Sequence, residues 1–209
     1  MTEAEFTPKS RNAKMVAPMR RVIHVGLGGG IAAAALFAPI PWVRAVVVVL
    51  ALGFVSLDVA RLISPQINRH VLRWFQPLMK ASEKSKRVTG ASYMLLAVAL
   101  CLLVFERDVA AAAILFLTVG DPAASLVGQR YGRRRIGQKS IEGTLAFFGI
   151  ALAVGLALFW AGKLDSPWMA AAGSGSAALA ELAPLPIDDN IWIPLAGALA
   201  IVLTGSLIQ

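Results

Sequence analysis

The sequence predicts an all-α, polytopic integral membrane protein: a bundle of about seven transmembrane helices with its N-terminus in the cytoplasm. Hydrophobic residues make up 57% of the 209 residues and charged residues only 15%, whereas soluble domains average about 45–50% and about 25%. Uncharged stretches recur along the chain, each close to the about 20 residues that one span requires. Basic residues gather in alternate connecting segments, as they do where those segments stay in the cytoplasm.

Seven stretches are predicted as spans from the gaps between charged residues. In chain order they cover residues 22–42, 41–63, 88–105, 109–128, 143–162, 167–182 and 190–209. The first has no charge between Arg21 and Arg44, and the fourth contains Asp121 and Pro122. The sixth is the weakest prediction because the Gly-Ser-Gly-Ser run at 173–176 makes it short and loose.

The remaining regions are assigned around these spans. Residues 1–19 are predicted to form a disordered or interfacial N-terminal arm, and residues 20–209 a single membrane-embedded catalytic domain. Within that domain, residues 64–87 are predicted to form a cytoplasmic interfacial segment, because aromatic and basic side chains such as Trp74 and Arg73 are mixed there, as in helices that lie in the headgroup layer. Packing of this segment on the cytoplasmic face of the bundle is the alternative.

The distribution of basic residues gives the orientation. All but three of the 20 Lys and Arg residues fall before the first span, between the second and third, or between the fourth and fifth. Because cytoplasmic loops hold the excess of Lys and Arg, we expect a membrane of the bacterial cytoplasmic type, with the N-terminus and the active site facing the cytoplasm. The net charge of +8 is therefore a topology signal, and no nucleic-acid partner is expected.

The acidic residues predict where chemistry takes place. An ionised side chain at membrane depth costs roughly 2.5–3.5 kcal/mol, so such residues are functional candidates. Six carboxylates fall on the predicted cytoplasmic side: Asp58, Asp121, Glu142, Glu181, Asp188 and Asp189. Beside Lys and Arg they suit a Mg²⁺ ion, which takes one or two carboxylates, waters and phosphate oxygens. The pattern predicts a binding site for a nucleoside triphosphate. In the alternative interpretation, Asp58 and Arg61 form a simple ion pair at a helix end.

The densest signal is the glycine-rich stretch 120–143. It begins Gly120-Asp121-Pro122 and ends Gly137-Gln138-Lys139-Ser140-Ile141-Glu142-Gly143. A proline break at membrane depth is tolerated where it lines a cavity or is buried in protein. Glycines let backbone amides approach phosphates, and a helix that starts near Ser140 offers free N–H groups to an anion. The stretch predicts a phosphate cradle. In the alternative interpretation its glycines are only turns and helix-packing notches.

Three smaller features carry weaker predictions. In Lys86-Arg87-Val88-Thr89-Gly90, the last two residues favour a helix start that holds phosphate, and the two cations are alternatively headgroup anchors. Gly26 and Gly30 form a small-x-x-x-small pair, which is most simply a close-packing surface. His24 is interpreted as a hydrogen-bonding group of the helix bundle, because it is not spaced as a metal ligand with any neighbour.

Several of these blocks, in this order, resemble the CTP-dependent lipid kinases, the family of dolichol kinase, phytol kinase and the CTP-using diacylglycerol kinase. The strongest are residues 120–143, Lys86-Arg87-x-Thr89-Gly90-Ala91, and Glu181 with Asp188-Asp189-Asn190-x-x-Ile193-Pro194, and weaker ones are Arg20-Arg21-x-x-His24 and Asp58-x-x-Arg61. The resemblance implies transfer of the γ-phosphoryl group of CTP to the hydroxyl of a membrane lipid alcohol (a polyprenol, a phytol-like alcohol or diacylglycerol), with Mg²⁺ or another divalent cation and release of CDP.

The resemblance also implies roles for individual residues. The catalytic residues would be Asp121, Lys139 and Glu142, and the hydroxyl proton would pass to Glu142 or to one of the Asp188–Asp189 pair. The metal ligands would be Asp121, Asp188 and Asp189. The nucleotide-binding residues would be Lys86, Arg87, Thr89, Gly120, Ser125, Gly128, Arg130, Gly132, Ser140 and Asn190.

Two other functions compete with a kinase. A phosphatidate cytidylyltransferase would use the same nucleotide but transfer CMP and release pyrophosphate, and this chain has Lys139-Ser140 where a Lys-Asp pair is expected. A non-enzymatic membrane transporter or scaffold would use Asp121, beside the broken helix, as an ion-coupling site. The choice of CTP over other nucleotides and the acceptor class rest on the resemblance alone.

Overall fold

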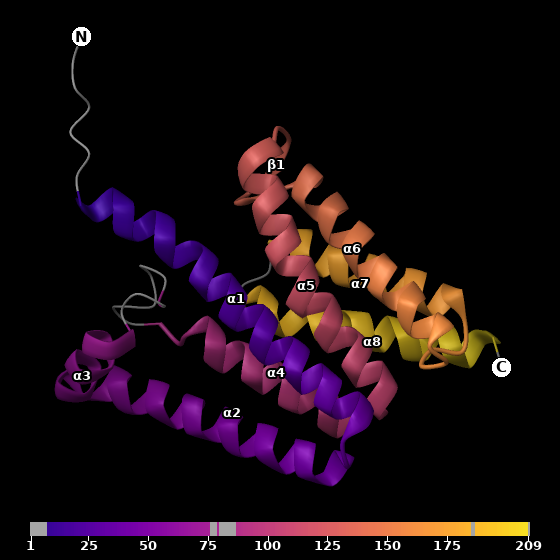
Figure 1. Cartoon of the computed structure of the whole chain (residues 1–209), viewed down its shortest axis with the longest axis horizontal. Helices are drawn as coiled ribbons and strands as arrows, with labels where there is room; N and C mark the ends of the chain where they lie inside the picture. The colour runs from indigo at the N-terminus through magenta and orange to yellow at the C-terminus, as the bar shows by residue number, and fades with distance from the viewer. Residues whose placement is uncertain (1–7, 76–78, 80–86, 185–186, 209) are drawn as a thin grey trace.

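The computed structural model describes residues 8–75, 79, 87–184 and 187–208, with the backbone alone for residues 8–18. In these parts the chain is helical apart from one short β-hairpin (Figure 1). The helices are α1 (Pro8–Phe37), α2 (Ile40–Ile63), α3 (Pro65–Phe75), α4 (Gly90–Val104), α5 (Arg107–Tyr131), α6 (Ile141–Trp160), α7 (Pro167–Leu182) and α8 (Asp189–Ile208). The hairpin pairs β1 (Arg135–Ile136) with β2 (Lys139–Ser140). The all-α prediction is confirmed for these residues, and the hairpin is the element that the sequence did not predict.

A helix lies in each of the seven stretches predicted as spans. Among the described residues, α2, α5, α6 and α8 are long and apolar enough to cross a membrane. α4 is apolar but has 15 residues, and α7 has 16. The apolar helices indicate a membrane protein, whereas the number of crossings and their orientation stay predictions.

Two boundaries at the N-terminal end differ from the prediction. α1 begins at Pro8, so residues 8–19 of the predicted arm continue the first helix, and residues 1–7 lie outside the described part of the chain. The first two predicted spans overlap, but α1 ends at Phe37 and α2 starts at Ile40. Pro39 separates them, because proline cannot donate the N–H that a continuing helix needs, and it has the extended backbone of an N-cap.

α5 is the central helix of the bundle. The ring of its fully buried Phe116 lies in a socket formed by glycines of three other helices. A Cβ atom added at Gly173 of α7, Gly155 of α6 or Gly197 of α8 would lie 3.0, 3.2 or 3.4 Å from this ring. The glycines weaken their own helices, but they let α6, α7 and α8 pack closely on α5.

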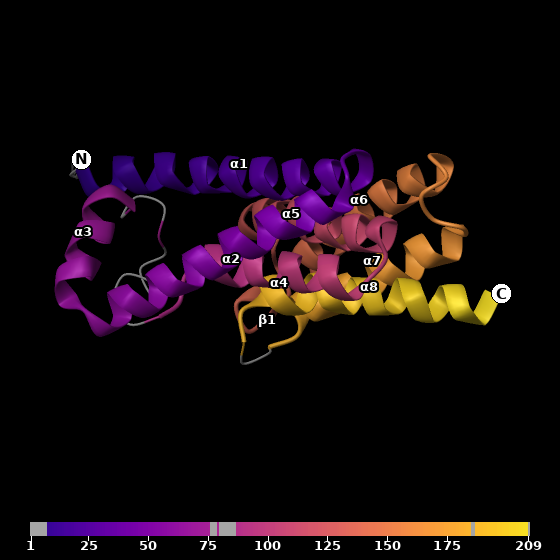
Figure 2. The same cartoon turned by 90° about the horizontal axis from the view of Figure 1, so that it is seen from below.

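α1 and α2 are held to the bundle separately. α1 packs mainly on α5 and α2 mainly on α4, and contact between α1 and α2 is slight. In Figure 1 the two helices diverge from their connection at residues 38–39 like the arms of a V, and Figure 2 shows the same pair from below. The prediction of a close-packing surface at Gly26 and Gly30 is wrong for the described residues, since a Cβ atom added at either glycine would meet nothing within 4 Å. Gly26 and Gly30 border a gap because α1 is packed against α5 and α2 against α4.

Three basic residues lie outside the segments predicted to be cytoplasmic, and all three contact the end of the bundle near this connection: Arg44, Arg107 and Lys163. Arg44 donates from Nε to the carbonyl oxygen of Leu102 at 2.6 Å, and Arg107 donates from Nη2 to that of Ala35 at 2.6 Å. Both acceptors lie near helix C-termini, where cations are favourable. Lys163 lies 3.7 Å from the carboxylate at the start of α5. The functional residues that the sequence predicts belong to the opposite end.

Candidate active site

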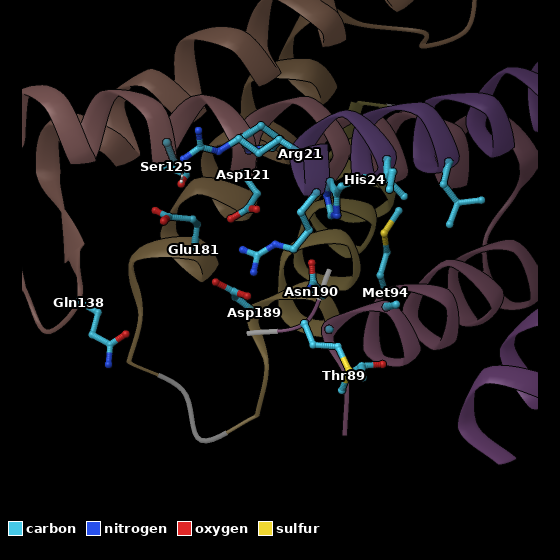
Figure 3. A pocket seen from close by; sticks show the side chains of 18 of the residues that line it. Arg21, His24, Thr89, Met94, Asp121, Ser125, Gln138, Glu181, Asp189 and Asn190 are labelled. Atoms are coloured by element: carbon cyan, nitrogen blue, oxygen red, sulfur yellow. Dashed lines mark hydrogen bonds between the residues drawn. The ribbon is translucent and has the colours of Figure 1, made fainter. Parts of the chain in front are cut away.

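The main cavity lies where α2, α5 and α7 end and where α4, α6 and α8 begin (Figure 3). Its volume is about 600 Å³, within the range of about 300–1,000 Å³ that small-molecule sites occupy. Polar side chains form one part, the polar lobe: Arg20, Arg21, Asp121, Ser125, Gln129, Arg135, Gln138, Lys139, Glu181, Asp189 and Asn190. Apolar side chains of the first four helices and of the segment after α3 form the other, the apolar lobe: Ile23, Leu27, Phe54, Leu57, Val71, Phe75, Met79, Ala91 and Met94.

Lys139 is the central cation of the polar lobe. Its Nζ lies 2.5 Å from Oδ2 of Asp189 and 2.9 Å from Oε1 of Glu181. Burial opposes the charged form, but the nearby carboxylates of Asp189, Glu181 and Asp121 outweigh it and raise the pKa of Lys139 above its usual value. Lys139 is therefore an ammonium ion at neutral pH and cannot act as a base.

The hairpin places Lys139 in the cavity. Lys139 pairs with Ile136 across the two strands, and Gly137 in the turn has a φ of 60°. This left-handed conformation favours glycine, because other residues clash with their own backbone there. Directly after the hairpin, Ser140 caps α6 by accepting a hydrogen bond from the N–H of Gly143 at 3.1 Å. The predicted helix start near Ser140 is confirmed.

The glycines around Ser140 allow α5 and α6 to approach. A Cβ atom at Gly128 or Gly132 would lie 2.7 or 2.8 Å from Oγ of Ser140, and one at Gly143 would lie 2.7 Å from the carbonyl oxygen of Ala124. These close contacts support the interpretation in which the glycines of the stretch 120–143 serve helix packing. They also bring Ser125 of α5 and Ser140 to the same cavity.

α1 contributes residues that were only weakly predicted. Arg21 donates from Nη2 to Oγ of Ser125 at 3.1 Å and to Oε1 of Gln129 at 3.0 Å. These hydrogen bonds link α1 to the C-terminal part of α5. His24 lines the cavity, and its Nε2 is buried without a hydrogen-bond partner among the described residues. In Figure 3 the Asp121 side chain lies between those of Glu181 and His24.

The start of α4 is occupied by a carboxylate of the protein itself. Asp58 Oδ2 accepts hydrogen bonds from the backbone N–H and the hydroxyl of Thr89, at 2.8 and 2.9 Å, and from the hydroxyl of Ser92 at 2.6 Å. Its Oδ1 lies 2.5 Å from Nε of Arg61, and Arg61 also donates to the carbonyl oxygen of Arg87. All of these groups bind the protein itself, so the predicted phosphate site at this helix start receives a buried carboxylate.

The structure brings part of the predicted site together. The predicted residues that line the cavity are Asp121, Lys139, Thr89, Ser125, Gly128, Ser140, Asp189 and Asn190. The described ones that are not part of its lining are Glu142, Arg87, Gly120, Arg130, Gly132 and Asp188. Lys86 lies outside the described residues.

The residues away from the lining have other contacts. Glu142 accepts hydrogen bonds from the backbone N–H groups of Arg133 and Arg134 at 3.1 and 3.2 Å, on the outside of the hairpin. Asp188 Oδ1 accepts from the backbone and side-chain amides of Asn190 at 3.1 and 2.6 Å. Asp188 thereby orients a residue that does line the cavity.

The sequence did not assign site roles to several lining residues. Arg20, Arg21, Gln129, Arg135 and Gln138 line the polar lobe, as does Glu181, whose Oε2 accepts from the hydroxyl of Thr144 at 2.8 Å. Glu181 stands out in the sequence as a lone acid at the end of an apolar stretch. Arg21 belongs only to a weak block of the family resemblance, and its contacts could not be predicted because its partners lie more than 100 residues away.

The donor set can be compared with the predicted cation. Among the described residues, no group of three or more His, Cys, Asp or Glu side chains is arranged to hold a metal ion. Asp121 and Asp189 both line the polar lobe, and Mg²⁺ requires only one or two carboxylates when phosphates and waters complete its shell. These two carboxylates therefore fit Mg²⁺ bound together with a nucleotide.

Comparison with known proteins gives the family. The chain is 29% identical over 171 residues to CTP-dependent diacylglycerol kinase 1 of Schizosaccharomyces pombe, which covers 73% of this chain and 78% of that one. It is 30% identical over 149 residues to an uncharacterized protein of Rickettsia prowazekii, covering 69% of this chain and 73% of the relative. The protein named "Probable phytol kinase 1, chloroplastic" of Glycine max is 30% identical over 123 residues, which cover 51% of this chain and 41% of that one. The chain belongs to the family of CTP-dependent lipid kinases.

Membership in this family agrees with the two lobes of the cavity, since a lipid kinase must bind a charged nucleotide beside an apolar acceptor. No protein-family model and no solved structure matches the chain.

Proposed function

We propose that this protein transfers the γ-phosphoryl group of CTP to the hydroxyl of a membrane lipid alcohol, which is a polyprenol, a phytol-like alcohol or diacylglycerol, and releases CDP. The observation that carries the proposal is the junction of two unlike lobes in one cavity. The polar lobe offers cations and carboxylates, the apolar lobe offers mainly apolar contacts, and Asp121 and His24 lie where they meet. Asp58 and Thr89 also line the cavity, but they are bound to each other.

The polar lobe binds the triphosphate. Arg20, Arg21, Arg135 and Lys139 line it, and phosphoryl transfer depends on such positioning and neutralisation of charge. Lys139, held between Asp189 and Glu181, turns its ammonium group to the phosphates when they arrive. Side chains supply most of this recognition, because the start of α4 is already bound to Asp58.

Mg²⁺ fits beside Asp121 and Asp189, where it would neutralise charge on the phosphates. The protein itself positions the reacting groups. Nε2 of His24 accepts or donates one hydrogen bond at the acceptor hydroxyl, and this buried nitrogen lacks a partner among the described residues.

The transfer is an in-line displacement. The hydroxyl oxygen of the lipid forms a bond to the γ-phosphorus, the bond from that phosphorus to the bridging β–γ oxygen breaks, and CDP leaves with the electron pair. Asp121, at the junction of the lobes, accepts the hydroxyl proton. Glu142 is not proposed for this role because its carboxylate binds the backbone between α5 and β1 and does not line the cavity.

The membrane arrangement that we propose is supported by the distribution of the basic residues. We propose seven crossings with the N-terminus in the cytoplasm of a bacterial-type cell, so that the polar lobe opens to cytoplasmic CTP. α3 has no buried residue, and its Trp74 is 75% exposed. It would lie in the headgroup layer as part of the predicted interfacial segment 64–87, within one catalytic domain that covers residues 20–209.

Labelled nucleotide tests the reaction. The full chain in mixed micelles is incubated with a panel of lipid alcohols and CTP labelled at either the γ or the α phosphorus, with ATP and GTP in parallel. We expect γ label, and no α label, in one class of lipid. Asp121→Asn should abolish transfer, whereas Asp165→Asn, an exposed acid between α6 and α7, should leave it unchanged. Transfer of α label would replace the kinase by a cytidylyltransferase, and nucleotide-independent ligand binding without transfer would favour a transporter or scaffold.

A further inference from the structure

A second cavity lies between α1 and α2. This α1–α2 groove has a volume of about 370 Å³, and every residue of its lining is apolar or glycine, including Gly26, Leu27 and Gly30 of α1 and Val43, Val46 and Leu50 of α2. Val46 is 56% exposed, so the groove opens on the outside of the bundle. Figures 1 and 2 show how α1 and α2, the two helices whose residues line the groove, diverge from their connection.

Within the described part of the chain, the glycines of α1 border open space in the groove. A Cβ atom added at Gly26 or Gly30 would meet nothing within 4 Å, so these glycines do not serve helix packing. Each costs a helix interior about 1 kcal/mol relative to alanine. Their effect in this fold is to keep the space along α1 free.

The groove continues the apolar lobe of the main cavity. Leu27 lines both cavities. On α1 the lining passes from Ile23 to Leu27 to Gly30, at the spacing of one helix face. On α2 it passes from Phe54 in the apolar lobe to Leu50 in the groove. One apolar path therefore leads from the junction of the lobes toward the α1–α2 connection.

We propose that the α1–α2 groove binds the hydrocarbon chain of the lipid acceptor next to its hydroxyl. The inference rests on the proposed function and adds where the acceptor lies. A chain attached to a hydroxyl at Asp121 must leave the site by an apolar path, and this path is continuous, uncharged and open to the bilayer. The groove runs about 10 Å along α1 from Leu27 to Ala34 at 1.5 Å per residue, against about 30 Å for the hydrocarbon layer.

The short length limits what the groove recognises. Only the part of the chain nearest the hydroxyl lies against protein, and the rest extends into the bilayer. Branching or unsaturation near the hydroxyl therefore affects binding, whereas the total length of the chain does not.

A matched pair of substitutions tests the groove. Gly29 and Gly30 are neighbours in α1, and a Cβ atom at either meets nothing within 4 Å, but only Gly30 lines the groove. Gly30→Leu should raise the KM for a long-chain acceptor by about tenfold or more, the range for a misfit in an apolar pocket, and leave the KM for CTP unchanged. Gly29→Leu should change neither. Equal lipid KM values for the two variants and the parent overturn the proposal.

Photolabelling gives a readout that does not need turnover. A long-chain primary alcohol with a diazirine in the first third of its chain is irradiated with the full protein in micelles, and the labelled peptides are identified. We expect label in α1 and α2, displaced by unlabelled alcohol and reduced in Gly30→Leu but not in Gly29→Leu. Uniform label over all outer helices, or a change of oligomeric state in Gly30→Leu in place of lost label, overturns the proposal. Labelling of the groove by a protein that phosphorylates no alcohol would instead count against the proposed kinase reaction alone.

Discussion

The starts of α4 and α6 look alike in sequence but receive opposite charges in the fold. Each begins with a hydroxyl residue, Thr89 or Ser140, whose oxygen caps the first turn, and both were predicted to hold phosphate. At α4 the fold delivers Asp58, a buried carboxylate from the end of α2. At α6 it delivers Lys139, whose ammonium group faces the cavity.

A hydroxyl-capped helix start is therefore not sufficient to make an anion-binding site. Partial positive charge at a helix N-terminus attracts any anion, and an internal carboxylate that is fixed in place excludes a ligand. The start of α4 is therefore structural. At α6 the first N–H groups are also bound within the protein, because that of Ile141 donates to the carbonyl oxygen of Arg134 and that of Gly143 to Oγ of Ser140. Phosphate binding is therefore expected at the side chain of Lys139, directly before α6.

Loss of the cation at α6 should have the largest effect. Lys139→Met should lower turnover by about 10³-fold or more, the scale on which a positioned cation supports phosphoryl transfer. Lys139→Arg keeps the charge for Asp189 and Glu181 and checks that the loss does not come from misfolding. Lys163→Met, at the opposite end of the bundle, is the control. Turnover of Lys139→Met within tenfold of the parent would remove Lys139 from the reaction.

Loss of the carboxylate at α4 should affect stability. Asp58→Asn removes the carboxylate that pairs with the buried Arg61 and should cost about 3–5 kcal/mol, as other broken buried pairs do. Asp108→Asn breaks the more exposed pair with Lys163 and should cost about 1 kcal/mol or less. Chemical unfolding in detergent measures both. A folded Asp58→Asn protein with normal stability and a strongly raised KM for CTP would place the phosphate at α4 after all.

The pH dependence of stability tests the charge of Lys139. Its folded pKa lies above the usual value of 10.5, so its pairing with Asp189 and Glu181 contributes fully below about pH 10.5 and is lost as the pH rises through the folded pKa. The difference in Tm between the parent and Lys139→Met should therefore stay constant from pH 7 to 10 and shrink only at higher pH. A difference that disappears between pH 8 and 10 would show that Lys139 loses its proton too early.

Removal of the two caps should give smaller, unequal effects. N-cap substitutions cost about 0.5–2 kcal/mol. Thr89→Ala also removes the hydroxyl that Asp58 binds and should fall at the upper end of this range, with Ser140→Ala below it. Ser166→Ala, at the start of α7, gives the value for a cap away from the cavity. Equal losses in all three variants would mean that the Asp58 contact adds nothing to the α4 start.

Glu142 should give the smallest effect. The resemblance implied a catalytic role, but its carboxylate accepts from backbone N–H groups outside the cavity. Oε2 lies 3.1 and 3.3 Å from the two N–H nitrogens, so the single carbonyl oxygen of glutamine in that position can accept from both. Glu142→Gln should therefore change turnover less than twofold under conditions where Asp121→Asn is inactive. Loss of activity in Glu142→Gln alone would return the proton transfer to Glu142.

The positions of the helices, their apolar character and the resemblance to the family could all be predicted from the sequence. Hydropathy and charge are local properties, and each stretch predicted as a span contains a helix. Lys139, Asp121 and Asp189 line one cavity, in line with the expectation that acidic residues and a glycine-rich stretch at the ends of apolar segments lie at one end of a bundle, while their roles in the reaction stay predictions. The contacts of the remaining residues depend on tertiary packing. Asp58 binds the start of α4, and Glu142 binds backbone N–H groups away from the cavity. Arg21 contacts α5, and Gly26 and Gly30 border a gap. Those outcomes depend on how helices far apart in the chain pack and rotate against one another, which no local pattern of residues records.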